Sequence, residues 1–411
     1  MTNSPLTPES GQGGSIPGGP ADDRPIQSEA VESEIEALAA AGQPPSAGRA
    51  VASQWKLMWW QFRRHRLAMA SAVVLLLIFL IAAFCEFVAP FDPLDFTPRY
   101  TYAPPQRVHL FDRDEKGDLV LRPYVNGFKV TIDKAALRRV FVVDPTVKYP
   151  IGFFVKTEPY KMWGIFTLEH KLIGPLDQKN PMFLLGADRL GRDLFSRTVY
   201  GTRISMSIGL IGVALSLFLG VVLGGISGYY GGRVDHVIQR VIEFILSLPT
   251  TPLWLGLAAA LPSDWPPLRI YLCITIILSL YGWTNLARVV RGRFLSLRTE
   301  DFVTAARLDG ASEPRIIFRQ MAPSFVSHII AEVSLAIPNM ILAETALSFL
   351  GLGLQPPIIS WGVLLQEAQN IRSIATAPWL FAPGIAVVIA VLALNFVGDG
   401  LRDAADPYSH R

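Results

Sequence analysis

Long apolar runs separated by short polar segments dominate the sequence from residue 67 onward. The first run, Leu67 to Cys85, contains no charged residue over 19 positions, and 19 residues at about 1.5 Å each cover the roughly 30 Å core of a bilayer. Five further runs lie at about 204–229, 238–261, 268–288, 325–349 and 378–399. We expect six transmembrane helices, most with the Gly or Pro that packed membrane helices tolerate.

The residues before the first run predict two segments. Residues 1–53 are rich in Gly, Pro, Ser and Ala, so they cannot bury enough apolar surface to offset their chain entropy, and we expect a disordered tail. Residues 54–66 mix Trp with Lys and Arg, which favours a helix in the membrane interface, the alternative being a simple basic flank. The first transmembrane segment, 67–89, starts too deep to be a cleaved signal.

Residues 90–185 predict a small β-rich insert between the first two transmembrane helices. Asn126-Gly127 stands between two apolar, β-prone runs, which is the strongest short hairpin signal. "LFDRDEKGDLVL", residues 110–121, indicates a second hairpin with a longer turn. The insert is rich in Lys and Arg, but segments this long cross a membrane largely regardless of charge.

Short basic segments predict the orientation. They are the flank before the first span, the turn with Arg233 and Arg240, and the stretch Arg288 to Arg319, which holds seven Arg against four acids. With six spans all three lie on one side, which the positive-inside rule makes cytoplasmic. Both termini are then cytoplasmic, and the insert is extracytoplasmic.

Composition supports a membrane protein and excludes several other classes. Hydrophobic residues make up 51% of the 411 positions, charged residues 17%, and the mean hydropathy is +0.35. The formal charge of +3 is small and scattered, so no nucleic-acid partner is expected. Cys85 and Cys273 lack metal-ligand spacing and should be small buried hydrophobes. No phosphate-binding GxxxxGK[ST] loop is present, so any ATP would be hydrolysed on another chain and no nucleotide cofactor is expected on this one.

One polar stretch, Asp301 to Pro323, interrupts the apolar runs. Phe302, Ala306 and Gly310 recur every four residues and should share a helix face, and Gly310 suits the left-handed end of that helix. Ser312 can cap a second helix, whose apolar edge would be formed by Ile316, Ile317, Gln320 and Met321. Such a hairpin is typical of a plug for a partner's groove; a solvated linker helix is the alternative.

The stretch "TAARLDGASEPRIIFRQMAP" resembles the cytoplasmic coupling loop of ABC importer permeases. Ala305, Ala306, Gly310 and Pro323 stand at matching positions. Thr304 replaces the usual acidic residue and Ala322 the usual leucine, as in the looser loop of peptide permeases. The resemblance implies an ATPase-coupling loop over residues 299–323. Its coupling residues would be Thr304, Ala305, Ala306, Gly310, Ala311, Ser312, Arg319 and Pro323.

Three further stretches resemble the second permease subunit of the dipeptide, oligopeptide and nickel importer group. They are Leu184 to Gly209, Ala346 to Gly362 and the ending "LNFVGDGLRDAADP". The resemblance implies an all-α fold of the type I ABC importer kind, with a permease core over residues 186–411. It also implies a bacterial inner-membrane location and peptide cargo, with nickel, opines or oligosaccharides as alternatives.

The same resemblance implies that this chain has no enzyme activity and no cofactor of its own, and that it works with a set of partners. A homologous second permease would complete a heterodimer, two ATPase subunits would carry ATP and Mg, and an extracytoplasmic binding protein would deliver the substrate. The chain would otherwise contact membrane lipid.

Ionisable residues within the apolar runs are functional candidates. Glu332 and Glu344 fall in the fifth run, where they either face a watery pathway between two permeases or pair with an Arg or a backbone group inside the bundle. A charge network is expected to be structural; its members are Asp188, Arg192, Asp193 and Arg203.

Two rival functions remain open. A secondary transporter would work alone and usually shows related halves, which this sequence lacks. An intramembrane serine protease would use Ser227 in "GISG", but His236 and His328 lie near span ends, so small-residue helix packing is favoured.

Overall fold

The computed structural model describes residues 54–113, 118–133, 138–262, 264–321, 323 and 326–405. The tail predicted for residues 1–53 lies outside these ranges. Leu57–Arg411 forms one compact unit. Its first helices are α3 (Gln54–Arg64), α4 (Arg66–Ala83), α5 (Cys85–Val88) and the short η1 (Pro98–Tyr100). After the strands come α6 (Leu194–Tyr230), α7 (Gly232–Ser247), α8 (Thr250–Ala259) and α9 (Pro267–Leu297).

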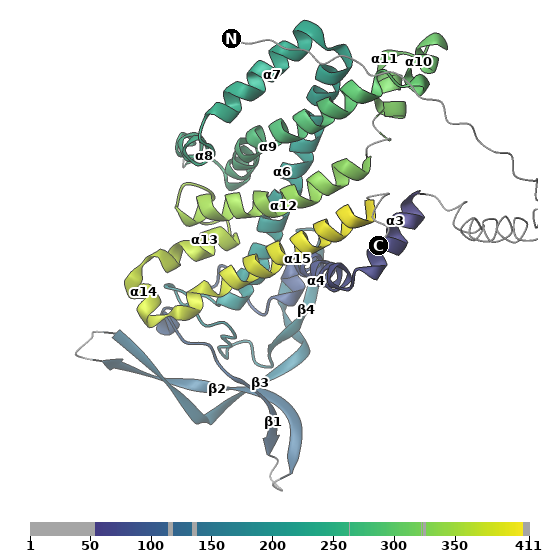
Figure 1. Cartoon of the computed structure of the whole chain (residues 1–411). Helices are drawn as coiled ribbons and strands as arrows, with labels where there is room; N and C mark the ends of the chain where they lie inside the picture. The colour runs from purple at the N-terminus through teal and green to yellow at the C-terminus, as the bar shows by residue number, and fades with distance from the viewer. Residues whose placement is uncertain are drawn as a thin grey trace, which may run out of the picture. The chain divides into compact units, whose positions relative to one another are not determined.

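The remaining helices complete the C-terminal part of the chain. They are α10 (Asp301–Leu308), α11 (Glu313–Arg315), η2 (Ile316–Met321), α12 (Val326–Phe349), α13 (Trp361–Gln366), η4 (Glu367–Gln369), α14 (Ile371–Thr376), η5 (Pro378–Phe381) and α15 (Ala382–Ala405). Figure 1 shows α6 crossing behind α9, α12 and α15, with the short α10 and α11 at one end and the strands at the other.

Four helical segments are long and apolar enough to cross a membrane among the described residues. They are Arg66–Ala83, Leu194–Tyr230, Pro267–Leu297 and Pro378–Ala404. The pair α7 and α8 becomes a fifth candidate if it counts as one broken span. The predicted count of six is therefore not reached by this criterion and stays a prediction.

The third predicted span, 238–261, is wrong as a continuous helix. The chain bends by 85° between α7 and α8. Leu248 is extended, with ψ of 133°, and Pro249 follows it. Proline lacks an amide hydrogen and disfavours helical backbone in the residue before it, so the helix stops here.

Glycines allow α6 and α9 to approach closely. A Cβ added at Gly224 would lie 2.5 Å from the Ala287 carbonyl oxygen, and one at Gly228 would lie 2.5 Å from the Phe294 Cβ. Such contacts show that only glycine fits at these two positions. The prediction that the small residues around Ser227 serve helix packing is confirmed.

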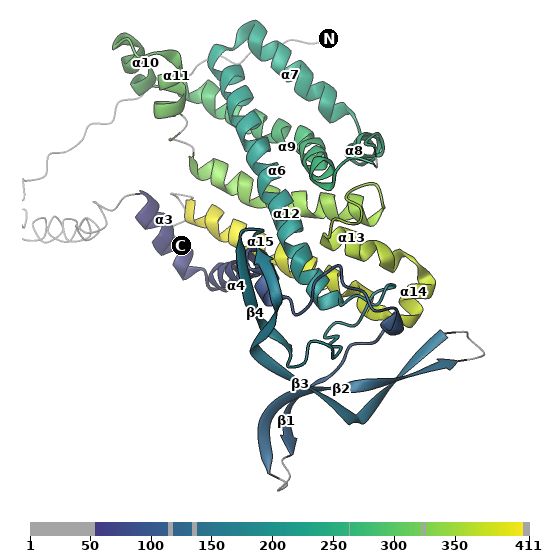
Figure 2. The same ribbon diagram turned by 180° about the vertical axis from the view of Figure 1, so that it is seen from behind.

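The strands form a four-stranded antiparallel sheet in the order β1-β2-β3-β4. Their bounds are β1 (Val108–Arg113), β2 (Leu119–Asp133), β3 (Arg138–Met162) and β4 (Phe166–Pro175). The first half of β3 pairs with β2, and its second half pairs with β4. Figure 2 shows β4 beside α4, with β1 at the far end of the sheet.

One of the two predicted hairpins is confirmed. Arg113 pairs with Leu119, so β1 and β2 form the hairpin expected at 110–121. The hairpin at Asn126-Gly127 is wrong, because both residues lie inside β2, where the register shifts between them. A Cβ at Gly127 would lie 2.8 Å from a Val147 methyl carbon, so the glycine marks a bulge with close packing.

Candidate functional site

Residues 301–321 fold into a helical hairpin between α9 and α12, here named the 301–321 hairpin. Its first helix, α10, ends in a Schellman motif. The Ala311 amide donates to the Ala306 carbonyl at 3.0 Å, and the Gly310 amide donates to the Arg307 carbonyl at 3.1 Å. Gly310 has φ of 75°, the left-handed conformation that glycine adopts most easily. The predicted glycine turn is confirmed.

The second half of the hairpin differs from a regular helix. Ser312 occupies the N-cap position of α11 as predicted, but its side chain makes no capping hydrogen bond. α11 lasts only 3 residues and continues as a π-helical turn, η2. π-Helical turns are rare and often occur at functional positions.

The inner face of the hairpin packs on α9. Buried side chains from both halves form one cluster with Phe294, namely Val303, Ala306, Ile316, Ile317 and Met321. Phe302 and Ala306 lie one turn apart in α10, as their spacing predicts, but only Ala306 is buried, while Phe302 is 43% exposed. The apolar stripe follows Val303 and Ala306, three residues apart, and leaves Phe302 at its edge.

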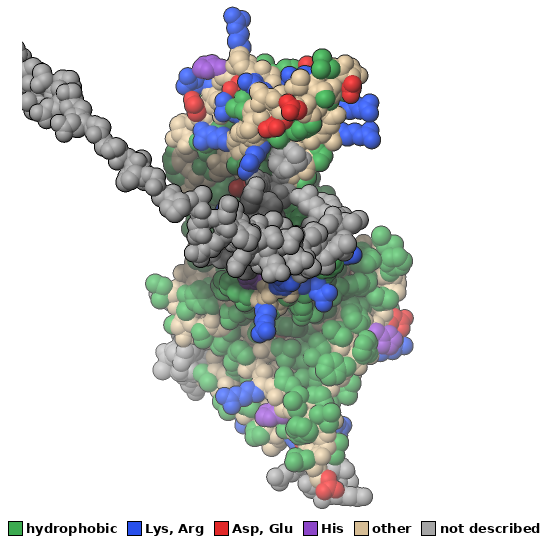
Figure 3. Space-filling view, turned by 45° about the vertical axis from the view of Figure 1, so that its right-hand side comes forward, with side chains coloured by type: hydrophobic (Ala, Val, Ile, Leu, Met, Phe, Trp, Pro, Cys, Tyr) green, Lys and Arg blue, Asp and Glu red, His purple; other side chains and the backbone are tan. Residues whose placement is uncertain are grey.

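The outer face carries exposed apolar side chains among polar ones. Leu308 is 84% exposed and Phe302 is 43% exposed. The other candidate coupling residues that are exposed are Thr304, Ala305, Gly310, Ser312, Arg319 and Pro323, whereas Ala311 is half-buried. Figure 3 shows charged side chains gathered at this end of the molecule and a largely hydrophobic surface below. Of the predicted Ala305-Ala306 face, only Ala305 is available to a partner.

Polar contacts tie the hairpin to the end of α6. The Tyr230 hydroxyl donates to Glu313 at 2.6 Å, and the Arg307 guanidinium lies over the Tyr229 ring at 5.1 Å. A separate ion pair joins α9 to α7, in which Arg291 donates to Asp235 at 2.6 Å. The hairpin is therefore joined to α6 by polar contacts and to α9 by the buried cluster.

Ser227 contacts the Asp235 carboxylate that Arg291 also binds, and it is not placed to act as a nucleophile. Its hydroxyl donates to Asp235 at 2.5 Å and accepts from the Gln239 amide at 3.2 Å. These partners in the described chain are a carboxylate and an amide, and neither is a histidine base. The geometry favours a structural role for Ser227.

A cavity of about 290 Å³ lies among α6, α8, α9 and α12. Apolar side chains form most of its wall, and the polar lining residues are Ser216, Tyr281, Asn285, Glu332 and Asn339. Glu332 is itself exposed. A mainly apolar cavity with a few converging polar groups is typical of a small-molecule binding site.

Glu344 lies away from this cavity lining, in the interior of the helices. Its side chain is fully buried. Ser348 and Ser360 donate hydroxyl hydrogen bonds to its Oε1 at 2.8 and 2.7 Å. Glu344 is therefore paired inside the bundle, but its partners are serine hydroxyls and not the Arg or backbone group expected from the sequence. Glu344 thus links α12 to the start of α13.

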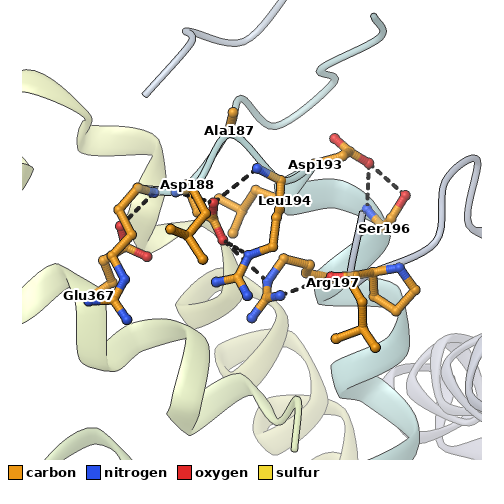
Figure 4. A network of polar contacts seen from close by, with 12 residues as sticks. Ala187, Asp188, Asp193, Leu194, Ser196, Arg197 and Glu367 are labelled. Atoms are coloured by element: carbon orange, nitrogen blue, oxygen red, sulfur yellow. Dashed lines mark hydrogen bonds and ion pairs between the residues drawn. The ribbon is translucent and has the colours of Figure 1, made fainter. Parts of the chain in front are cut away.

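The predicted charge network is only partly correct. Asp188 is 2% exposed and lies 2.6 Å from Arg192 Nε and 3.6 Å from Arg197 Nε, and Figure 4 shows this arrangement. Arg203 is not part of it, since its guanidinium pairs with Glu86 at 2.5 Å. Arg197 was missed because it lies inside α6, where the sequence indicates only a helix. We call the group around Asp188, Asp193 and Arg197 the 188–197 cluster.

Asp193 caps the first turn of α6. Its carboxylate accepts from the Ser196 amide at 2.8 Å and from the Ser196 hydroxyl at 2.6 Å. Burial raises the pKa of Asp193 to about 6, although the Ser196 hydrogen bonds oppose this effect. The cluster fixes the start of α6, as the 301–321 hairpin engages its end.

Apolar membrane-length helices, a mainly apolar cavity among them and a polar hairpin are the features of a polytopic membrane transport protein. The comparisons with known proteins agree. Residues 220–409 match the family described as binding-protein-dependent transport system inner membrane component, and residues 53–105 match the N-terminal TM domain of oligopeptide transport permease C. The chain belongs to this family and is a permease subunit of an ABC importer.

Two relatives and one solved structure illustrate the similarity. The dipeptide transport system permease protein of Bacillus subtilis is 37% identical over 228 residues, or 55% of this chain and 69% of the relative. The glutathione transport system permease protein of Pectobacterium atrosepticum is 36% identical over 249 residues, or 61% and 79%. One chain of the MetNI methionine ABC transporter, solved in an inward-facing conformation, aligns at 14% identity with a TM-score of 0.39. The alignment covers 52% of this chain and 98% of the transporter chain.

Proposed function

We propose that this chain forms half of a translocation pathway for peptides and is driven by ATPase subunits that bind the 301–321 hairpin. The observation that carries the proposal is the two-faced packing of this hairpin. Its inner face is buried against Phe294, while Leu308 on the outer face is 84% exposed. A single exposed leucine is ordinary on a protein surface, so the proposal rests on Leu308 together with the 43% exposed Phe302, and on the match of this segment to the permease family.

A movement of the hairpin would be transmitted to the membrane helices through its contacts with α6 and α9. Arg307 and Glu313 contact the last residues of α6, and the buried cluster joins the hairpin to α9. α6 and α9 in turn line the cavity that contains Glu332. Closure of partner ATPases, which would hold ATP and Mg, could thereby reshape the cavity by rigid-body movement.

The cavity suits a small polar solute. Glu332 and the two asparagines offer hydrogen bonds and one negative charge, within walls that are mainly apolar. A peptide has an ammonium group and amides that match these groups, and the curated relatives are named for dipeptide and glutathione transport. A homologous permease would complete the pathway, and an extracytoplasmic binding protein would deliver the peptide.

The membrane arrangement follows from this assignment. α12 has 24 residues, which at about 1.5 Å each gives a helix long enough to supply a sixth span. The hairpin and both termini would lie in the cytoplasm of a bacterial inner-membrane protein, and the strands β1 to β4 would lie outside.

Uptake by the complete importer tests the peptide assignment. The chain would be co-expressed with a partner permease, ATPase subunits and a binding protein. Accumulation of a labelled dipeptide, a labelled pentapeptide, labelled nickel, a labelled opine and a labelled oligosaccharide would then be compared. Peptide uptake that requires both this chain and ATP is expected. Nickel, opine or oligosaccharide uptake without peptide uptake would replace the peptide assignment.

A further inference from the structure

The turn between β3 and β4 presents an uncharged apolar tip, residues 162–168, named here the 162–168 tip. Its sequence, MWGIFTL, contains no Lys, Arg, Asp or Glu. Trp163 and Gly164 have φ of 51° and 73°, which closes the turn tightly. Three large side chains around this turn are exposed, by 47% at Trp163, 74% at Ile165 and 56% at Phe166.

The tip is fixed to the end of a membrane-length helix. The Trp163 indole N–H donates to the carbonyl of Ala83, the last residue of α4, at 2.6 Å. The Phe84 and Trp163 rings lie 5.7 Å apart, and the Trp163 and Phe166 rings lie 6.3 Å apart. Figure 2 shows the β4 end of the sheet next to α4. The depth of the tip along the membrane normal is therefore set by α4.

The apolar surface of the tip continues that of α4. Leu76, Leu77 and Leu80 are exposed by 59%, 55% and 45%, as expected for a span whose side chains face lipid. Phe84, 36% exposed, connects this surface to Trp163. Tryptophan is enriched where a span meets the headgroups, because its ring is apolar and its N–H is polar.

We propose that the 162–168 tip inserts into the bilayer boundary at the end of α4, with Trp163 at headgroup level and Ile165 and Phe166 among the acyl chains. The sheet is then held at the membrane by the tip as well as by its packing against α5. Lipid is favoured over water because moving apolar side chains such as Ile165 and Phe166 out of water is favourable. The proposal does not depend on which solute the importer carries.

Spin labelling of the full chain in membranes tests the proposal. In a background where Cys85 and Cys273 are replaced by alanine, Ile165→Cys would carry the label. Leu119→Cys is the matched control, since Leu119 is a leucine at the start of β2 with 72% exposure, at the other end of the sheet. The labelled protein, with its co-purifying subunits, would be reconstituted in phosphatidylcholine and phosphatidylglycerol vesicles.

Collision rates with oxygen and with a water-soluble nickel chelate distinguish the environments. The label at residue 165 is expected to collide readily with oxygen and poorly with nickel, so its oxygen-to-nickel ratio exceeds that of the control severalfold. Nickel access equal to the control would place the tip in water. Low access to both reagents would mean that another protein covers the tip, and either result overturns the proposal. Phe166→Cys should repeat the lipid pattern.

Discussion

The 301–321 hairpin and the 188–197 cluster are both polar and contact opposite ends of α6. They differ in whether their charged side chains are buried or exposed. In the cluster, Asp188 is 2% exposed and Arg197 is 3% exposed, and they face each other. In the hairpin the charged side chains face solvent, while Leu308 is 84% exposed. The cluster completes its contacts within the chain, whereas the hairpin leaves an apolar surface open.

In this permease, the buried charged residues should therefore stabilise the fold, and the exposed apolar residues should bind partners. A buried charge is stable only with its partners in place, so the cluster should govern folding. An exposed apolar side chain contributes little to folding, so the hairpin surface should govern partner binding. The following changes test this division, beginning with the largest expected effect on stability.

Asp188→Ala should cause the largest loss of stability. It leaves Arg197 buried without its carboxylate, and such broken buried pairs typically cost about 3–5 kcal/mol. Unfolding in detergent, followed by tryptophan fluorescence, measures the loss. Glu243→Ala is the control, because the Arg240–Glu243 pair is 70% and 53% exposed and should contribute almost nothing. Equal stability of the two variants would contradict the role given to the cluster.

Asp193 should make stability depend on pH. Its folded pKa of about 6 lies above the usual value near 3.9, so between these values the folded state binds more protons than the unfolded state. Its contribution is fully present below pH 4 and is lost as pH rises through 6, by about 3 kcal/mol in all. Asp193→Asn keeps the cap and should gain stability relative to the native chain from pH 4 to 7. A flat difference between the two curves would refute the assignment.

Gly310→Val should disturb coupling more than folding. Nothing lies within 4 Å of a Cβ at Gly310, so the cost is backbone strain at φ of 75°, about 1–2 kcal/mol. Because strain at this turn changes the angle between α10 and α11, we expect ATP-driven uptake and ATPase co-purification to fall. Gly310→Asn, which tolerates this conformation, is the control. Normal uptake by the valine variant would mean that the turn angle is unimportant.

Glu332→Gln should have the smallest effect on stability. Glu332 is exposed at the cavity, so the loss of its charge should alter the concentration dependence of uptake and leave subunit assembly unchanged. Glu344→Gln provides the comparison, because Glu344 binds Ser348 and Ser360 in the interior. If uptake changes only in the Glu344 variant, the cavity is not the pathway.

Local signals in the sequence predicted the features that depend on local chemistry. Gly310 ends α10 because left-handed backbone suits glycine, and that is a property of a few neighbouring residues. The strong hairpin signal of Asn126-Gly127 failed because a distant residue, Val147, packs on Gly127 and tertiary pairing overrides turn preference.

Partners distant in the sequence could not be predicted. Arg203 pairs with Glu86, 117 positions away, and Glu344 with Ser360 across a loop. Pro249 carried a usable signal for the break between α7 and α8, but membrane helices often tolerate proline, as α12 does at Pro338.

The most direct test of the central claim is ATPase binding by Leu308→Asp. Ile371→Asp is the matched control, since Ile371 begins α14 away from the hairpin and is 82% exposed. Co-purification of the ATPase subunits and ATP-driven uptake would be measured for both variants in membranes. We expect Leu308→Asp to lose most of both while Ile371→Asp retains them. Full ATPase binding and uptake by the Leu308 variant would contradict the claim that the exposed face of the 301–321 hairpin is the coupling surface.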